Sequence, residues 1–246
     1  MNLLRNLILI LPVLCVISCN SDSKNDESTK VNIVFQEASA KFTEPQKDFI
    51  HKVITNSGKE VRKLLPKLPD GIKVIVENVD WDLDAVGGVT GRTETNAPPV
   101  VFIQISNKYQ NGIIDSVRLG IKSTIFHEFH HLSRGWAIKD NTFSPGIPNA
   151  MVNEGLAVAF TEIYTGNVHE GNAYTDVTDT WVKEILLLPI DASYADWVMG
   201  EHPDGRTYIG YRTGNFLIRK AMTNSGKNIL ELSNLTPKEI IKLAGY

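Results

Sequence analysis

The sequence predicts an α+β fold, in which a small N-terminal β-sheet is followed by a mostly helical C-terminal half. Two short β-branched segments precede residue 106, whereas the regular apolar patterns after residue 116 have helical spacing. A small β layer before a run of helices is typical of α+β domains. The chain has 246 residues, 42% of them hydrophobic and 22% charged, so it is long and apolar enough to bury a sizeable core.

The expected elements follow from the spacing of apolar residues and from the glycines. Apolar residues with helical spacing predict a helix over residues 45–65. The alternating segment 71–77 (GIKVIVE) predicts a strand, the glycines of 84–91 predict a turn, and 99–105 (PVVFIQI) predicts a second strand. Further helices are expected over 116–132, 149–164, 177–188, 208–222 and 237–244.

Residues 1–18 have the layout of a secretory signal. A single cation, Arg5, precedes the apolar run Leu7–Ile17, which is too short to span a bilayer. The run ends in Val16-Ile17-Ser18-Cys19, which resembles a bacterial lipobox, where cleavage precedes a cysteine that is then acylated. We therefore expect a lipoprotein signal peptide with Cys19 as the lipidation site. An ordinary signal peptide with an incidental cysteine is the alternative.

The residues after Cys19 predict a tether outside the cytoplasm. Residues 20–30 are polar and charged without an apolar side chain, a composition typical of disorder. We therefore divide the mature chain into a lipid-anchored flexible tether over 19–40 and a folded domain over 41–246. The acidic residues of the tether resemble the surface-export signals of some Gram-negative lipoproteins. The expected location is the bacterial cell envelope, anchored by lipid to the outer membrane. The resemblance favours the cell surface, and the inner face of this membrane is the alternative.

Composition excludes two kinds of chemistry. Both cysteines, Cys15 and Cys19, fall in the signal segment, so the mature domain contains neither a disulfide nor a catalytic thiol. The formal net charge of −3 provides no basic surface for nucleic acid, and no nucleic-acid partner is expected.

The segment His127-Glu128-Phe129-His130-His131 contains the pattern H-E-x-x-H within an expected helix. Residues four apart lie on one face of a helix, so His127 and His131 can bind the same zinc ion. Glu128 directly follows the first ligand, which suits a general base that takes a proton from water. The alternative is a structural helix with a fortuitous cluster of histidines.

A catalytic zinc site needs a third protein ligand and an open position. The metzincin extension of the motif would require Gly and His where Arg134 and Ala137 stand, so it is excluded. Glu154 lies 23 positions after His131, which leaves room for a turn, a loop and re-entry on a second helix. On spacing alone, Glu154 is equally well explained as the third ligand or as a solvent-exposed glutamate on a helix.

These motifs resemble a known group of proteins. H-E-x-x-H followed by N-E-G-L-A is similar to the gluzincin pattern, whose third ligand is this glutamate. HEFHHLSR, NEGLA and Gly210-Tyr-Arg-Thr-Gly214 together resemble the predicted zinc-dependent proteases of the YjaZ-like group, over roughly residues 64–222. The resemblance implies a Zn²⁺ ion held by His127, His131 and Glu154, and a zincin-like fold with a small sheet over the active-site helix. Asn153 departs from the Asp that often precedes this glutamate.

Peptide hydrolysis also needs a donor for the oxyanion that develops on the attacked carbonyl. Gluzincins commonly take it from a Tyr or His of the C-terminal half, where the candidates are Tyr211, Tyr208 and His202. Tyr211 leads because it lies in the segment that resembles the family. Tyr208 and Tyr211 are three residues apart and share a helical face, and a role as core aromatics is the alternative for both. Strand 100–105 is a candidate edge for an extended peptide.

The pattern therefore predicts a zinc metallopeptidase (a hydrolase of gluzincin type) that acts on peptides or proteins outside the cytoplasm. The alternative from another class is a non-catalytic surface lipoprotein that keeps zinc for folding or for binding a partner. A third hypothesis, hydrolysis of a non-peptide amide such as cell-wall material, shares the same site. Replacement of Glu128 by Gln separates the first two, because it abolishes turnover only in an enzyme.

Overall fold

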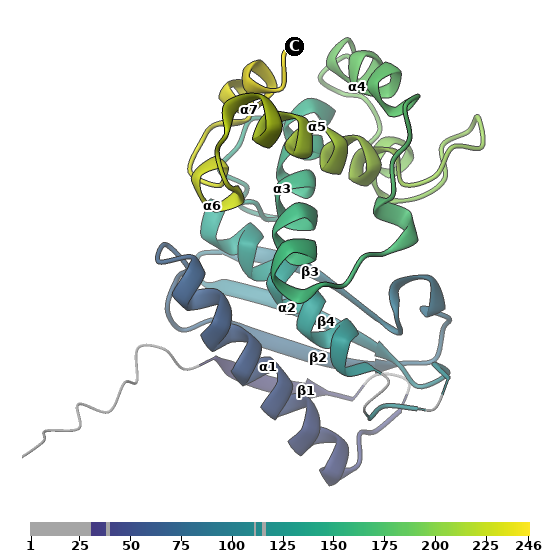
Figure 1. Cartoon of the computed structure of the whole chain (residues 1–246). Helices are drawn as coiled ribbons and strands as arrows, with labels where there is room; N and C mark the ends of the chain where they lie inside the picture. Colours follow the sequence, from purple (N-terminus) through teal and green to yellow (C-terminus); the bar gives the residue numbers. More distant parts are fainter. Residues whose placement is uncertain (1–30, 38–39, 111, 115–116) are drawn as a thin grey trace, which may run out of the picture.

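The computed structural model describes residues 31–37, 40–110, 112–114 and 117–246. The predicted signal peptide and Cys19 lie outside these residues. The described chain has mixed α and β structure, with a sheet and two long helices in one half and a cluster of helices in the other (Figure 1). No helix within the described residues is long and apolar enough to cross a membrane.

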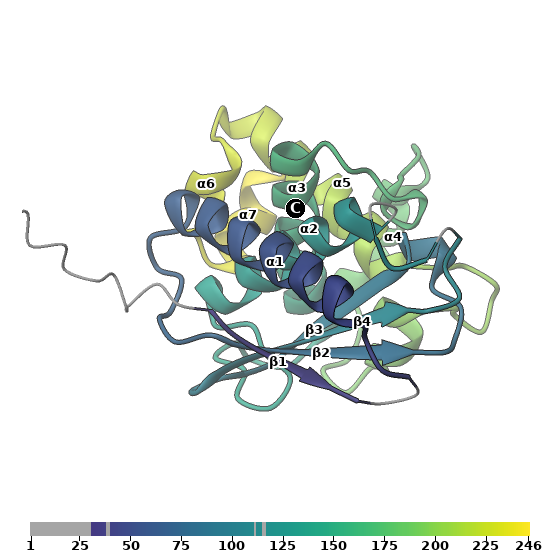
Figure 2. The ribbon, with the colours of Figure 1, turned by 90° about the horizontal axis from the view of Figure 1, so that it is seen from below.

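The sheet has four strands in the order β1-β2-β4-β3. The strands are β1 (Asn32–Gln36), β2 (Lys73–Val79), β3 (Val89–Asn96) and β4 (Pro99–Ser106). β1, β2 and β4 run parallel to one another, and β3 pairs antiparallel with β4. Figure 2 shows the helices gathered on one side of the sheet, so the buried side chains of the strands point to that side.

Most helices fall close to the predicted ranges, but the short helix over residues 229–232 was not predicted. The helices are α1 (Glu44–Leu64), α2 (Arg118–Arg134), α3 (Ile147–Thr165), α4 (Thr178–Leu186), α5 (Ile209–Ser225), α6 (Ile229–Leu232) and α7 (Pro237–Leu243). Thr43 begins α1 with a capping box, in which its hydroxyl accepts from the backbone N–H of Gln46 while the Gln46 side chain accepts from the N–H of Thr43. The prediction of a small N-terminal sheet followed by a helical half is confirmed.

Two strands were missed by the sequence-based prediction. β1 lies inside the range 19–40 that was expected to be a tether, and it pairs with β2, so the folded domain begins at Asn32 rather than at residue 41. β3 begins at Val89, where only a turn was expected, and the actual turn is a 3₁₀ segment (Asp84–Val86) followed by two glycines.

The second missed strand changes which edge of the sheet is free. β4 is paired on both sides, by β2 and by β3, so the expectation that strand 100–105 offers an edge is wrong. The edge on the side of α2 belongs to β3.

Helices α3 and α5 cross at two glycines. A Cβ atom on Gly155 would lie 2.3 Å from the backbone carbonyl carbon of Gly214, and one on Gly214 would lie 2.3 Å from the carbonyl oxygen of Met151. No side chain fits at either position, so the two backbones are in direct contact. This contact brings the first turn of α5, with Tyr211, close to the part of α3 that carries Glu154.

Candidate metal centre

His127 and His131 project from the same face of α2, one helical turn apart. Their Nε2 atoms are 3.0 Å apart, and the two rings are nearly perpendicular, at 87°. Other positions of α2 carry apolar side chains that are fully buried in the core: Ile121, Ile125 and Phe129. The apolar pattern of the helix therefore determines which way the two imidazoles face.

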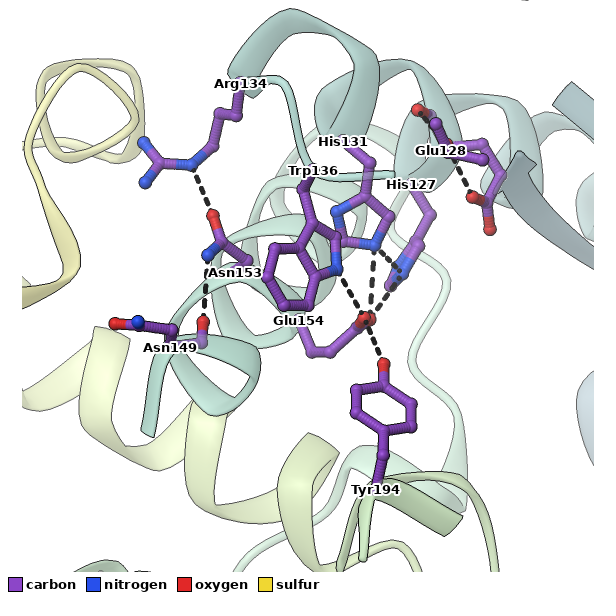
Figure 3. A network of polar contacts seen from close by, with 10 residues as sticks. His127, Glu128, His131, Arg134, Trp136, Asn149, Asn153, Glu154 and Tyr194 are labelled. Atoms are coloured by element: carbon purple, nitrogen blue, oxygen red, sulfur yellow. Dashed lines mark hydrogen bonds and ion pairs between the residues drawn. The ribbon is translucent and has the colours of Figure 1, made fainter. Parts of the chain in front are cut away.

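Glu154 reaches the same point from α3. Its Oε2 atom is 3.2 Å from Nε2 of His127 and 3.2 Å from Nε2 of His131, and the residue is only 4% exposed. Figure 3 shows the three side chains converging. Three lone-pair-bearing atoms at these distances cannot all satisfy one another without a proton or a cation among them. Two imidazole nitrogens and one carboxylate oxygen are ligands that zinc prefers, so the cluster fits a zinc ion.

The charges of the cluster determine where a proton resides without metal. Burial lowers the pKa of His127, but its hydrogen bond to Glu154 and the charges of Glu128 and Glu154 outweigh the effect of burial, so this pKa lies above its ordinary value of 6.5. Burial raises the pKa of Glu154, but His131 and His127 together hold it well below the ordinary 4.5. Without metal, His127 thus keeps its proton to a higher pH than an ordinary histidine would, and a bound metal ion displaces that proton.

The other carboxylate oxygen of Glu154 is held by two residues that sequence reasoning missed. Oε1 accepts hydrogen bonds from the indole Nε1 of Trp136 (3.0 Å) and from the hydroxyl of Tyr194 (3.1 Å). Trp136 follows Gly135, whose φ of 77° ends α2 in the left-handed conformation. Tyr194 precedes a π-helical turn (Ala195–Met199) between α4 and α5. No local pattern marks either residue as part of a site.

Glu128 leaves α2 on the side of strand β3, away from the two histidine rings (Figure 3). The hydroxyl of Thr93 lies 3.0 Å from its Oε2 and 3.0 Å from its backbone carbonyl oxygen. β3 can approach this closely because of Gly91, where a Cβ would lie 2.5 Å from Cγ2 of Thr124 and 3.0 Å from Cγ of Glu128. The carboxylate is buried beside the metal cluster without belonging to it.

A cavity of about 260 Å³ opens beside His127 and Glu128. Its walls come from β3, α2, the C-terminal part of α3 with the loop that follows, and the start of α5. Tyr208 and Tyr211 both line it. A group bound in this cavity would therefore contact His127 of the metal cluster, Glu128 and the two tyrosines together.

The three candidate oxyanion donors differ in their surroundings. The ring centroid of Tyr211 is 6.3 Å from that of His127. The charge of Glu154, burial and the charge of Glu128 raise the pKa of Tyr211 well above its ordinary value, so its phenol keeps its proton and can donate. Tyr208 has a φ of 53° at the start of α5. His202 lies elsewhere: its ring packs against that of Trp197, with centroids 4.6 Å apart and planes inclined at 57°, and it does not line the cavity described above.

A second polar network lies behind the metal cluster. Asn153 accepts from Nε of Arg134 (2.9 Å) and donates to the backbone oxygen of Asn149 (2.8 Å). The Arg134 guanidinium also donates to the backbone oxygens of Ser233 and Leu235, and burial lowers its pKa to about 10. Asn153 therefore binds Arg134 through its side-chain amide, although a carboxylate often stands at this position. Through Arg134, helices α2 and α3 are connected to the segment that follows α6.

His130 belongs to this rear network and not to the metal cluster. Its Nε2 is 2.9 Å from the hydroxyl oxygen of Ser233, and the residue is fully buried. Burial, followed by the charge of Arg134, lowers the pKa of His130 well below its ordinary value. His130 is therefore a neutral side chain of the interior.

Comparison with known protein families gives one match. Residues 75–242, more than half of the chain, match the family model described as "Predicted Zn-dependent protease (DUF2268)". The chain belongs to this family. The range matched by the DUF2268 model includes the metal cluster, Glu128 and Tyr211, but not β1 or α1. No curated protein and no solved structure matches the chain.

Proposed function

We propose that the protein is a zinc-dependent peptidase of the gluzincin type, with a zincin-like arrangement and a relationship to the YjaZ-like group. One observation carries the proposal: the ligand atoms of His127, His131 and Glu154 converge beside a cavity that also contains the buried carboxylate of Glu128. A structural zinc site is normally closed by four protein ligands. Only these three donors gather at this point among the described residues, which favours a catalytic site with an open position.

The chemistry divides between the metal and the protein side chains. Zinc, when bound, supplies a Lewis acid that acidifies a water molecule and polarises the substrate carbonyl. Glu128 accepts the proton of the attacking water on its carboxylate, while Thr93 holds that carboxylate in place. As the C–N bond breaks, Glu128 returns the proton to the leaving nitrogen, which leaves one carboxylic acid and one amine.

Tyr211 is proposed as the donor to the oxyanion. Its ring lies beside His127 and lines the cavity, and its phenol remains protonated because two carboxylates lie nearby. A neutral donor can stabilise a developing negative charge without first attracting a carboxylate product. Tyr208 lines the same cavity and is the second candidate, whereas the position of His202 against Trp197 does not favour it.

Strand β3 supports an extended peptide or protein as the substrate. Near its middle the outer edge is occupied, because the backbone oxygens of Thr93 and Glu94 accept from the N–H groups of Ile138 and Lys139. Nearer its start, residues 89–91 line the cavity. An extended peptide could add to this part of the edge through backbone hydrogen bonds, with its scissile bond next to Glu128.

The location of the enzyme is proposed from the sequence alone. The apolar run ending at Cys19 supports a lipid anchor that holds the domain on the outer membrane, outside the cytoplasm. Substrates would then be peptides or proteins of the cell envelope or of the surroundings.

The test combines metal analysis with digestion of a peptide library. The wild-type protein should bind one zinc ion and cleave peptides. Glu128→Gln should keep its zinc and lose about 10²–10⁴-fold in turnover, the usual contribution of general acid–base catalysis. Glu60→Gln is the matched control, because Glu60 lies on α1 and pairs with Lys122 at 2.7 Å, away from the cavity.

Each outcome separates two hypotheses. Unchanged cleavage in Glu128→Gln would contradict the proposed general base. A wild-type protein that binds zinc but cleaves no peptide would favour the non-catalytic binding protein.

A further inference from the structure

The two oxygens of the Glu154 carboxylate have different surroundings. Oε2 faces the Nε2 atoms of His127 and His131, at 3.2 Å from each. Oε1 accepts hydrogen bonds from two neutral donors, Trp136 Nε1 at 3.0 Å and Tyr194 OH at 3.1 Å. Figure 3 shows the indole and the phenol reaching the carboxylate from different sides.

The different partners of the two oxygens determine how the Glu154 carboxylate can bind a metal ion. A carboxylate has about four lone-pair sites and can ligate a metal through one oxygen or through both. Two hydrogen bonds on Oε1 occupy the lone pairs that bidentate ligation would need. They also fix the orientation of the carboxylate plane before any metal arrives, because a rotation of the group would break both bonds at once.

We propose that Tyr194 and Trp136 are positioning residues for the metal, which hold Glu154 as a monodentate ligand through Oε2. The inference rests on the metal site of the proposed function but not on its turnover. Both residues donate to Oε1 of Glu154, so they act on the metal through this ligand. Partners that orient a metal ligand commonly change metal affinity by about 10–100-fold when they are removed.

The two donors differ in how they are attached to the fold. Trp136 is local to α2, since its backbone N–H donates to the carbonyl oxygen of His131 at 3.0 Å. Tyr194 belongs to the segment between α4 and α5, 40 residues from Glu154. Tyr194 therefore connects the segment between α4 and α5 to the metal ligand. The orientation of Glu154 depends on the position of this segment.

The decisive measurement is the zinc affinity of Tyr194→Phe, obtained by competition with a chelator of known affinity at constant pH. The dissociation constant should rise about 10–100-fold. The tyrosine is 38% exposed and the change removes only a hydroxyl, so the metal-free variant should unfold at nearly the wild-type temperature. Trp136→Phe removes the other donor and should raise the dissociation constant in the same direction.

Tyr174→Phe is the matched control. Tyr174 is 41% exposed and packs edge-on against Phe216 at 5.5 Å, so its zinc affinity should equal that of the wild type. A second readout is the visible absorption spectrum of the cobalt-loaded proteins, which reports the ligand geometry. This spectrum should change in Tyr194→Phe and remain the same in Tyr174→Phe.

The result that overturns the proposal is a folded Tyr194→Phe variant with wild-type zinc affinity and an unaltered cobalt spectrum. A wild-type protein that binds no zinc would overturn it as well. A wild-type protein that binds zinc, loses affinity in Tyr194→Phe and cleaves no peptide would contradict the proposed peptidase while leaving the positioning role intact.

Discussion

The hydroxyl oxygen of Thr93 on β3 lies 3.0 Å from Oε2 of Glu128 on α2. Its single proton is shared between this carboxylate oxygen and the backbone carbonyl of the same residue, also at 3.0 Å. Thr93 is 4% exposed, so water does not readily replace its hydroxyl. The edge strand of the sheet therefore orients Glu128, the proposed general base.

Replacement of Thr93 by Val should impair catalysis without loss of metal. Valine keeps the shape of the side chain but removes the donor, so the carboxylate of Glu128 loses a fixed partner. Hydrogen bonds to charged groups contribute about 1.5–3 kcal/mol, and we expect kcat/KM to fall at least about tenfold. Thr95→Val is the control, since the Thr95 hydroxyl donates to the Pro98 carbonyl at 2.6 Å. Equal kinetics for the two variants would contradict a role for Thr93.

Tyr211→Phe should lower kcat and kcat/KM together, because the phenol is proposed to act only on the transition state. Loss of one oxyanion donor typically lowers kcat by about 10²–10³-fold, while KM and zinc content should remain close to wild type. His202→Ala is expected to retain wild-type kinetics within a few-fold, because this ring packs on Trp197. Full activity in Tyr211→Phe would transfer the role to Tyr208.

The stability gained on binding zinc should increase with pH. In the metal-free protein the raised pKa of His127 contributes stability below its ordinary value of 6.5, which is lost as the pH rises through the raised pKa. The lowered pKa of Glu154 contributes stability above 4.5, which is lost as the pH falls through the lowered pKa. The interaction between His127 and Glu154 therefore stabilises the metal-free protein most between pH 4.5 and pH 6.5.

Zinc has the opposite preference, since it binds the neutral imidazole and must displace the proton. The difference in Tm between zinc-loaded and metal-free protein, measured by calorimetry at fixed free zinc, should therefore widen from about pH 5.5 to about pH 8. A difference that stays constant over this range would show that no ligand exchanges a proton for the metal.

Cys19→Ser should release the protein from the membrane fraction. Two or three acyl chains on one cysteine bind far more firmly than a single myristoyl chain, whose membrane binding is marginal at about 10⁴ M⁻¹. Fractionation of cells that express the full chain would report the distribution. Cys15→Ser is the control, because Cys15 lies within the segment expected to be removed, and it should remain membrane-bound. Persistent membrane association of Cys19→Ser would argue against the lipid anchor.

The sequence predicted that His127 and His131 lie together because a helix converts spacing into geometry. His127 and His131 are four apart, and helical periodicity alone requires them to share a face. Glu154 needed more than spacing, since its position depends on a loop and a second helix. The N-E-G-L-A resemblance supplied that information, and the Gly155 contact with α5 gives its physical basis.

The missed elements carry weaker signals. β1 has only five residues with alternating exposed and half-buried side chains, and β3 (VTGRTETN) is largely polar because it is an edge strand. Neither offers the apolar pattern that marks a buried strand. Trp136 and Tyr194 reach Glu154 from 18 and 40 residues away, and a single indole or phenol has no spacing to detect. His202 is a candidate because gluzincins commonly take this donor from a Tyr or His of the C-terminal half. It lies in the turn closed by the Glu201–Thr207 bridge and does not line the cavity.

The backbone of each helix fills the space that a side chain at Gly155 or Gly214 of the other helix would need. The effects of substitutions at these two positions on the free energy of unfolding should therefore be coupled. A methyl group at either glycine would push α3 and α5 apart. Once the helices are separated, a methyl group at the second glycine would find room. Substitution of both by Ala should therefore destabilise the protein by much less than the sum of the single changes. Within a family of such chains, the two positions would have to vary as a pair, and each joint change would shift Glu154 relative to Tyr211.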